Sequence, residues 1–212
     1  RVIKIGSPML EVINKNLKKI NASKILKKYK LIKKKYFLVS IHREENVDNT
    51  KNFKALMETI NGIYKKYKLP IIVSTHPRTR AKLNKNNYKF HKSIIFEKPF
   101  GFNDFNKLQI NARCIISDSG TITEESSIFN VPAVMIRQAH ERPEGMEEGT
   151  LIMSGLNVNN TIHSINTVCN QHRSKRIMKI VKDYDVDNFS KKVLRIVLSY
   201  TDFVNSNVWK KQ

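Results

Sequence analysis

Short apolar runs alternate with amphipathic segments along this chain, and the alternation predicts a doubly wound α/β domain of the Rossmann-like kind. Five or six of the runs are continuously apolar, which is typical of parallel strands that helices cover on both faces. Polar clusters follow three of the runs, at residues 42–46, 76–78 and 118–121. Because ligands of such sheets bind at the carboxyl ends of the strands, we expect the three clusters to share one site.

The predicted elements follow one another as short strands and longer helices. Strands are expected at residues 1–5, 36–41, 69–75, 94–96, 114–116, 133–136 and 150–153. Helices are expected at residues 8–20, 50–67, shortly after 78, and at 103–112, 121–129, 160–171 and 187–204. Ser7 is the expected N-cap of the first helix with Pro8 at its first position, and Asn103 is the expected N-cap of another.

The length and composition fit one folded domain of a longer protein. The chain has 212 residues, 40% of them apolar and 27% charged, which is ordinary for a globular protein. It opens at Arg1 within an apolar pattern, so we expect further sequence before it. No apolar run approaches the roughly 18 residues that span a bilayer, and nothing resembles a signal peptide. We therefore expect a cytoplasmic protein without membrane attachment.

The net charge of +21 allows two interpretations. One is a basic nucleic-acid-binding module. The other is a set of solvated helix faces rich in lysine. The excess occurs as pairs and triplets, such as 33–35, and no aromatic-rich RNA motif interleaves with them, so we favour solvated faces and expect no nucleic-acid partner. The charge would still favour encounter with an anionic ligand or surface.

The two cysteines, Cys114 and Cys169, fall in a predicted strand and a predicted helix. We expect them to lie far apart as reduced structural thiols, and their spacing is not that of metal ligands. The sequence also lacks a nucleophile elbow, a P-loop and a Rossmann glycine triplet. No metal or cofactor is therefore expected.

Residues 114–149 contain the clearest candidate site. A strand, the turn Ser119-Gly120-Thr121 and a helix follow one another there, and this arrangement presents backbone N–H groups to an anion such as phosphate. The alternative is an ordinary helix cap. One turn further on, Glu124 or Glu125 could accept the hydroxyls of a ribose, or both could merely complement the helix dipole. Spacing alone does not choose between these two carboxylates.

Two further clusters have a functional and a structural interpretation each. His42 and Arg43 stand beside acids at the end of a buried strand, which suits phosphate binding or proton transfer, although a salt-bridged loop would have the same composition. The loop 137–148 contains Arg142 among several acids, and arginine suits phosphate binding. The alternative for this loop is a solvated lid.

Five motifs together resemble one family. SDSGTITEES, HERPEGMEEG, SIHREEN, STHPRTR and KPFGF occur in the order and spacing of the C-terminal domain of the non-hydrolysing UDP-N-acetylglucosamine 2-epimerases. The resemblance implies half of a GT-B fold, in which two Rossmann-like domains hold a nucleotide sugar between them. It further implies that residues 1–186 bind UDP and that the helix in 187–212 packs on an N-terminal domain absent from this sequence.

The resemblance also assigns roles to single residues. His42 is similar to the family's phosphate-contacting and catalytic histidine, and Phe105 to the aromatic residue beside uracil. Ser119, Gly120 and Thr121 occupy the diphosphate-binding positions. Glu125 occupies the position of the carboxylate that binds ribose, and Arg142 that of the arginine in the ERPE loop.

The implied reaction inverts C2 of a UDP-2-acetamido sugar by eliminating and re-adding UDP, without metal or nicotinamide. Thr121, GSPM and KPFGF resemble a subgroup that makes UDP-N-acetyl-L-fucosamine for surface polysaccharides such as capsules. The acid–base carboxylates belong to the N-terminal domain, so we expect UDP binding without turnover here, and a homodimer for the full-length enzyme. The competing hypotheses are the nucleotide-binding half of a GT-B glycosyltransferase and a basic RNA-binding module.

Overall fold

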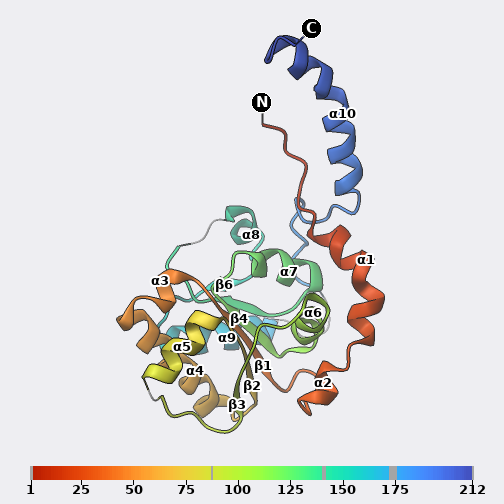
Figure 1. The fold of residues 1–212 in the computed structure, drawn as a ribbon. Coiled ribbons are helices and arrows are strands. Elements are labelled where there is room, and N and C mark those ends of the chain that lie inside the picture. Colours follow the sequence, from red (N-terminus) through yellow and green to blue (C-terminus); the bar gives the residue numbers. More distant parts are fainter. Residues whose placement is uncertain (1, 87, 140–141, 172–175, 212) are drawn as a thin grey trace.

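Six parallel strands form one sheet in the computed structural model, which describes residues 2–86, 88–139, 142–171 and 176–211 (Figure 1). The strands in chain order are β1 (Phe37–Ile41), β2 (Ile71–Thr75), β3 (Ile94–Glu97), β4 (Cys114–Ser117), β5 (Ala133–Met135) and β6 (Ile152–Met153). Their spatial order is β3-β2-β1-β4-β5-β6. From β1 the chain adds β2 and β3 on one side of the sheet, and from β4 it adds β5 and β6 on the other side. The predicted doubly wound α/β class is confirmed.

The strand order reverses between β1 and β4, which pair directly. Their register places Phe37 beside Cys114 and Ser40 beside Ser117. The loops that leave the carboxyl ends of these two strands therefore separate to opposite faces of the sheet and leave a crevice between them. The polar residues after β1 and β4 belong to these two loops.

Helices cover both faces of the sheet. They are α1 (Met9–Ala22), α2 (Ile25–Lys28), α3 (Glu44–Val47), α4 (Thr50–Tyr67), α5 (Pro77–Lys85), α6 (Phe102–Asn111), α7 (Thr121–Phe129), α8 (Pro143–Glu147), α9 (Val158–Gln171) and α10 (Phe189–Asn207). Alternate residues of β1 point to opposite faces, as the pleat requires. Phe37, Val39 and Ile41 join the core beneath α4 and α9, whereas Leu38 joins the core beneath α2, α6 and α7.

The strand expected at the start of the chain is wrong. Residues 2–5 pair with no strand, and Val2 is fully exposed. This segment instead crosses the chain just before α10, where Lys4 pairs with Asp183 at 2.6 Å and the Ser7 N–H donates to the Asp183 carbonyl at 2.7 Å. Gly6 has φ +87° at this crossing, and a Cβ there would collide with Val186. A short apolar run predicts a strand only where a neighbouring edge is available to pair with it.

Three smaller predictions need correction. Gly101, not Asn103, occupies the N-cap of α6, and it provides no side-chain bond. At α1 the helix begins one residue after Pro8, with the Ser7 hydroxyl accepting from the Met9 N–H at 3.1 Å. The helix α3 was not expected, because its residues were interpreted as a polar loop.

The expectation that the two cysteines lie far apart is also wrong. Cys169 on α9 packs against the core that contains Cys114 on β4, and each thiol donates to a backbone carbonyl, Cys114 to Ile115 and Cys169 to Arg113. Both are free thiols. Burial raises the pKa of Cys114.

The last helix stands apart from the domain. Figure 1 shows α10 extending away from the sheet beside the N-terminal segment, and no described residue of α10 is buried. Its exposed side chains include Leu194 at 59% and Leu198 at 67% of full exposure. Within the described ranges, none of the helices combines the length and apolar character needed to cross a bilayer.

Candidate functional site

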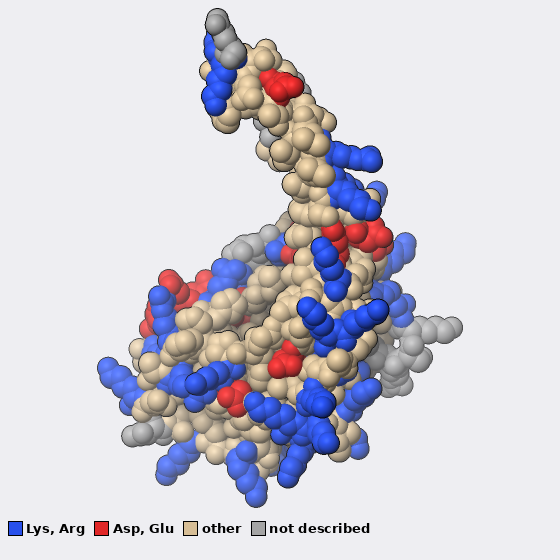
Figure 2. All heavy atoms as spheres, turned by 45° about the vertical axis from the view of Figure 1, so that its right-hand side comes forward, with Lys and Arg blue, Asp and Glu red and all other residues tan. Residues whose placement is uncertain are grey.

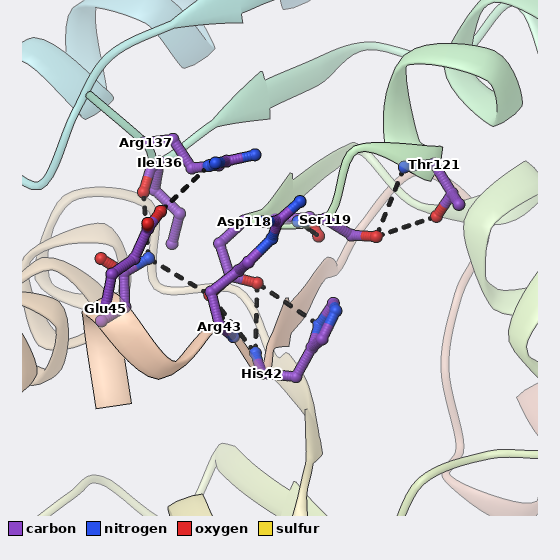
Figure 3. A network of polar contacts seen from close by, with 10 residues as sticks. His42, Arg43, Glu45, Asp118, Ser119, Thr121, Ile136 and Arg137 are labelled. Atoms are coloured by element: carbon purple, nitrogen blue, oxygen red, sulfur yellow. Dashed lines mark hydrogen bonds and ion pairs between the residues drawn. The ribbon is translucent and has the colours of Figure 1, made fainter. Parts of the chain in front are cut away.

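A buried carboxylate joins the loops that follow β1 and β4. Asp118 comes directly after β4 and is 0% exposed. Its oxygens accept hydrogen bonds from the backbone N–H groups of His42 and Arg43 at 3.1 and 3.0 Å, and from the Asn46 side chain at 3.2 Å (Figure 3). A carboxylate accepts several donors at once, so Asp118 fixes the shape of the loop after β1.

His42 lies at the edge of this network. Its Nδ1 is 3.4 Å from an Asp118 oxygen, while 46% of the side chain remains exposed. A carboxylate beside one ring nitrogen favours a proton on that nitrogen and thereby sets the orientation of the ring. The other ring nitrogen can then meet a ligand.

The N-terminus of α7 forms the other side of the crevice. Gly120 occupies the N-cap and Thr121 begins the helix, so the first N–H groups of α7 lack a cap from the N-cap side chain. The Ser119 hydroxyl lies 2.9 Å from the Thr121 hydroxyl and 3.4 Å from the Thr121 N–H (Figure 3). The 3.4 Å contact between the Thr121 N–H and the Ser119 hydroxyl is a weak version of the side-chain cap that serine often provides at a helix start. Two hydroxyls and a helix N-terminus together form an arrangement that suits an anion.

The two neighbouring glutamates of α7 face different surroundings. Glu124 accepts a bond from Arg142 Nη2 at 2.6 Å and another from the Ser7 hydroxyl. Glu125 instead lines a cavity of about 70 Å³, together with Phe105 and the residues of the helix start. The full lining of this cavity is Ser40, Phe105, Gln109, Ile115, Ser117, Ser119, Thr121, Ile122 and Glu125. The sequence could not distinguish the two carboxylates, and the structure does.

Burial changes the acidity of Glu125. Its pKa is raised from 4.5 to about 7, chiefly because burial removes the carboxyl from water; the Gln109 amide opposes this rise and the nearby charge of Glu124 adds to it. Gln109 was not predicted as a site residue. Its side chain is 0% exposed, and neither of its amide atoms reaches hydrogen-bond geometry with a described residue, although the amide lies near enough to Glu125 to act on its pKa. A polar ligand in the cavity would supply such partners.

Arg142 lies in a second, larger cavity of about 320 Å³. Its lining comprises Gly6, Ser7, Pro8, Glu124, Arg142, Glu144, Asp183 and Tyr184. The Tyr184 hydroxyl donates to Glu144 at 2.7 Å across this space. Arg142 therefore shares the cavity with the segments that enter and leave the domain, and it is oriented by Glu124 and not by the residues around Glu125.

Other polar residues reach the same rim. Arg78, at the start of α5, bonds to Glu44, so the cluster after β2 meets the cluster after β1. Arg137 follows β5, is only 5% exposed, and bonds to Glu45 at 3.1 Å. Its position at a strand end could have marked it in the sequence. His140 and Glu141 lie outside the described residues, and elsewhere in the described chain no cluster of His, Cys, Asp or Glu could hold a metal ion.

The role of Asp118 is testable by unfolding. Replacing Asp118 by Ala leaves three donors without their acceptor, so the free energy of unfolding should fall by about 3 kcal/mol or more, at roughly 1 kcal/mol for each group. Asp118→Asn keeps one acceptor oxygen and should show a smaller loss. Urea denaturation measures both, with the exposed Asp202→Ala as the matched control, which should change stability by less than about 0.5 kcal/mol. Equal losses for Asp118→Ala and Asp202→Ala would contradict this role.

The raised pKa of Glu125 predicts a specific pH dependence. Between pH 4.5 and about 7 the folded chain retains a proton that the unfolded chain has released, so this group makes the fold less stable as pH rises through that window. Glu125→Gln removes the effect and should be more stable than the parent above pH 7, on the order of 1–3 kcal/mol. The difference should vanish towards pH 4.5.

Thermal or denaturant unfolding across this pH range measures the difference. Glu124→Gln is the control, because its carboxylate is bonded to Arg142 and Ser7, and its replacement should lower stability. A difference between Glu125→Gln and the parent that does not change with pH would disprove the assignment.

Comparisons with known proteins identify the family of this chain. The sequence profile described as UDP-N-acetylglucosamine 2-epimerase matches residues 1–198. The enzyme of that name from Methanococcus maripaludis is 36% identical over 178 residues, which cover 80% of this chain and 48% of the relative. The one from Methanocaldococcus jannaschii is 33% identical, covering 82% of this chain and 50% of the relative. The chain thus spans about half the length of these curated relatives.

Solved structures extend the match to three dimensions. The UDP-N-acetylglucosamine 2-epimerase of Rickettsia bellii superposes with a TM-score of 0.87 at 45% identity, covering 97% of this chain and 55% of that one. The Methanocaldococcus jannaschii enzyme, solved in complex with UDP-GlcNAc and UDP, gives a TM-score of 0.82 at 32% identity and covers 92% of this chain and 54% of that one. With its doubly wound sheet, its crevice at the strand reversal and these matches, this chain belongs to the UDP-N-acetylglucosamine 2-epimerase family.

Proposed function

We propose that this chain is the UDP-binding part of an enzyme that inverts C2 of a UDP-2-acetamido sugar. The observation that carries the proposal is the cavity beside the N-terminus of α7, where Phe105, Glu125 and two hydroxyls meet. An aromatic ring, a carboxylate and a helix N-terminus match the three parts of UDP, namely base, ribose and diphosphate. The complex of UDP-GlcNAc and UDP with the Methanocaldococcus jannaschii relative supports the same ligand class.

Each residue then has a chemical role. Phe105 packs beside the uracil ring, and Glu125 accepts the two ribose hydroxyls. The diphosphate lies at the start of α7, where Ser119, Gly120 and Thr121 donate to its oxygens. The proposed partner on the opposite side is His42, whose ring is oriented by Asp118.

His42 and Arg142 favour loss of the nucleotide. A hydrogen-bond donor or a guanidinium beside the leaving group stabilises the negative charge that UDP acquires as it leaves. Arg142 occupies the neighbouring cavity, from which its guanidinium can reach an anionic group on the sugar side. In this proposal His42 is the catalytic residue of the chain, and the other residues hold the leaving group.

Proton transfer at C2 is assigned to another domain. The chain spans about half of its curated relatives, and we propose that the missing half carries the acid–base carboxylates. The exposed apolar residues of α10 would pack on that half, with residues 1–186 forming the UDP-binding domain and 187–212 the connecting helix. We further propose a cytoplasmic, homodimeric enzyme that supplies surface polysaccharide synthesis, and Thr121 favours the UDP-N-acetyl-L-fucosamine-forming subgroup.

Calorimetric titration with UDP tests the ribose contact. Glu125→Gln should weaken UDP binding by roughly 10–100-fold, because hydrogen bonds to a charged acceptor contribute about 1.5–3 kcal/mol. The 2′,3′-dideoxy analogue of UDP should bind the parent chain similarly weakly, and Glu125→Gln should weaken that analogue no further. Glu58→Gln, an exposed substitution on α4, is the control. If Glu125→Gln weakened the binding of UDP and of the dideoxy analogue equally, the proposed contact between Glu125 and the ribose hydroxyls would be wrong.

A second experiment tests the division of labour. Incubated alone with UDP-N-acetylglucosamine in deuterated water, the chain should bind the nucleotide sugar and incorporate no deuterium at C2, because the proposed acid–base groups are absent. Nuclear magnetic resonance of the sugar measures the exchange. Deuterium incorporation that depends on His42 would show that these 212 residues already contain the acid–base chemistry.

A further inference from the structure

A group of lysines lies at the end of the sheet opposite to the crevice. In a parallel sheet the segments that lead into the strands share one end, and the segments that leave the strands share the other. Lysines occupy the segments that lead into the first three strands: Lys30, Lys33 and Lys35 before β1, Lys66 and Lys68 before β2, and Lys92 before β3. We call these six residues the basic end. It lies at the bottom of the domain in Figure 1.

Acidic residues are missing from the same segments. No Asp or Glu occurs in the sequence between Glu11 and Glu44, or between Glu58 and Glu97. Acids occur in segments that leave other strands, such as Glu44 and Glu45 after β1, whereas the segment that leaves β2 has no acid and contains Arg78, Arg80, Lys82 and Lys85. The contrast in charge between the two ends of the sheet is therefore clearest at β1, where the entering segment has lysines without acids and the leaving segment has Glu44 and Glu45.

The lysines of the basic end are exposed, and none is in an ion pair within the described part of the chain. Figure 2 shows Lys and Arg side chains along the lower margin of the domain. Both the N-terminal segment and α10 leave the domain at its other end (Figure 1). The basic end is therefore open to a large partner while the crevice faces away from it.

The chemistry of this end favours a lipid surface over a nucleic acid. Ile32 is 63% exposed between Lys30 and Lys33, and an aliphatic side chain among lysines suits the boundary between headgroups and acyl chains. Bases of RNA would need open aromatic rings or arginine forks. The ring of Tyr64 is already stacked on His91 at 4.3 Å, and the Tyr29 hydroxyl donates to Glu97.

We propose that the basic end docks peripherally on an anionic phospholipid bilayer, with Ile32 inserting shallowly between headgroups. This reverses the expectation, based on sequence alone, that the lysines only solvate helix faces and that the protein has no membrane partner. Docking through this end leaves the crevice accessible from the aqueous side. The inference does not depend on the identity of the nucleotide ligand.

Co-sedimentation with vesicles tests the proposal. The protein should bind vesicles of phosphatidylglycerol mixed with phosphatidylcholine and should not bind phosphatidylcholine alone, and added salt should weaken binding. The triple variant Lys33→Gln, Lys35→Gln, Lys66→Gln should lose affinity by roughly tenfold or more. Its matched control is Lys51→Gln, Lys54→Gln, Lys191→Gln, which removes the same charge elsewhere and should retain binding.

Three outcomes would overturn the proposal. Equal losses in the two triple variants would mean that net charge, not the basic end, drives binding. The absence of sedimentation with the anionic vesicles would exclude a lipid partner at once. The surface would be assigned to nucleic acid if Ile32→Ser left vesicle affinity unchanged and the protein bound single-stranded RNA more tightly than vesicles, with an affinity that falls strongly as salt is added. A fall in vesicle affinity for Ile32→Ser, with circular dichroism unchanged, is the expected result.

Discussion

The hydrogen bonds to Asp118 are the constraint on which the site depends. Both segments at the reversal of strand order leave the sheet, and the last backbone hydrogen bond between them runs from the Asp118 N–H to the Ser40 carbonyl at 3.3 Å. Beyond that bond the Asp118 side chain joins them from a fully buried position, with two backbone N–H groups and one side-chain amide as its donors. The position of His42 relative to the start of α7 follows from this one carboxylate. Because Asp118 is buried, each of these donors would destabilise the fold if it lost its acceptor.

Adjacent residues on α7 serve two different cavities because a helix turns by about 100° per residue. Glu124 is bonded to Arg142 and to Ser7 of the segment that enters the domain, whereas Glu125 lies among apolar and amide groups and has its pKa raised to about 7. Glu124 is thus paired with a cation, whereas Glu125 lines a cavity and has no cation beside it in the described chain. A ligand with hydroxyl groups could donate hydrogen bonds to Glu125, as Arg142 does to Glu124.

The fold was largely predictable from the sequence because parallel strands and amphipathic helices leave strong periodic patterns. Residues 121–129 were predicted as a helix with the bounds that α7 has. The errors occurred where tertiary contacts decide, at residues 2–5 without a strand to pair with and at the two cysteines, which α9 brings together. Likewise, no local pattern marks Gln109, whose importance comes from burial without a partner. The roles proposed for His42, Phe105 and Glu125 stay predictions.

The net charge of +21 is spread over the chain, and six of its lysines form the basic end. Around the crevice, acids and arginines neutralise one another in pairs such as Arg78 with Glu44 and Arg142 with Glu124. These pairs fix side chains in place but contribute little net field. The six lysines of the basic end, which lead into β1, β2 and β3, have no ion-pair partners in the described chain, so their positive charge stays available to a partner. Anion binding in the crevice therefore rests on local geometry, namely the helix start and its hydroxyls, and the charge of the basic end acts on whatever meets that end.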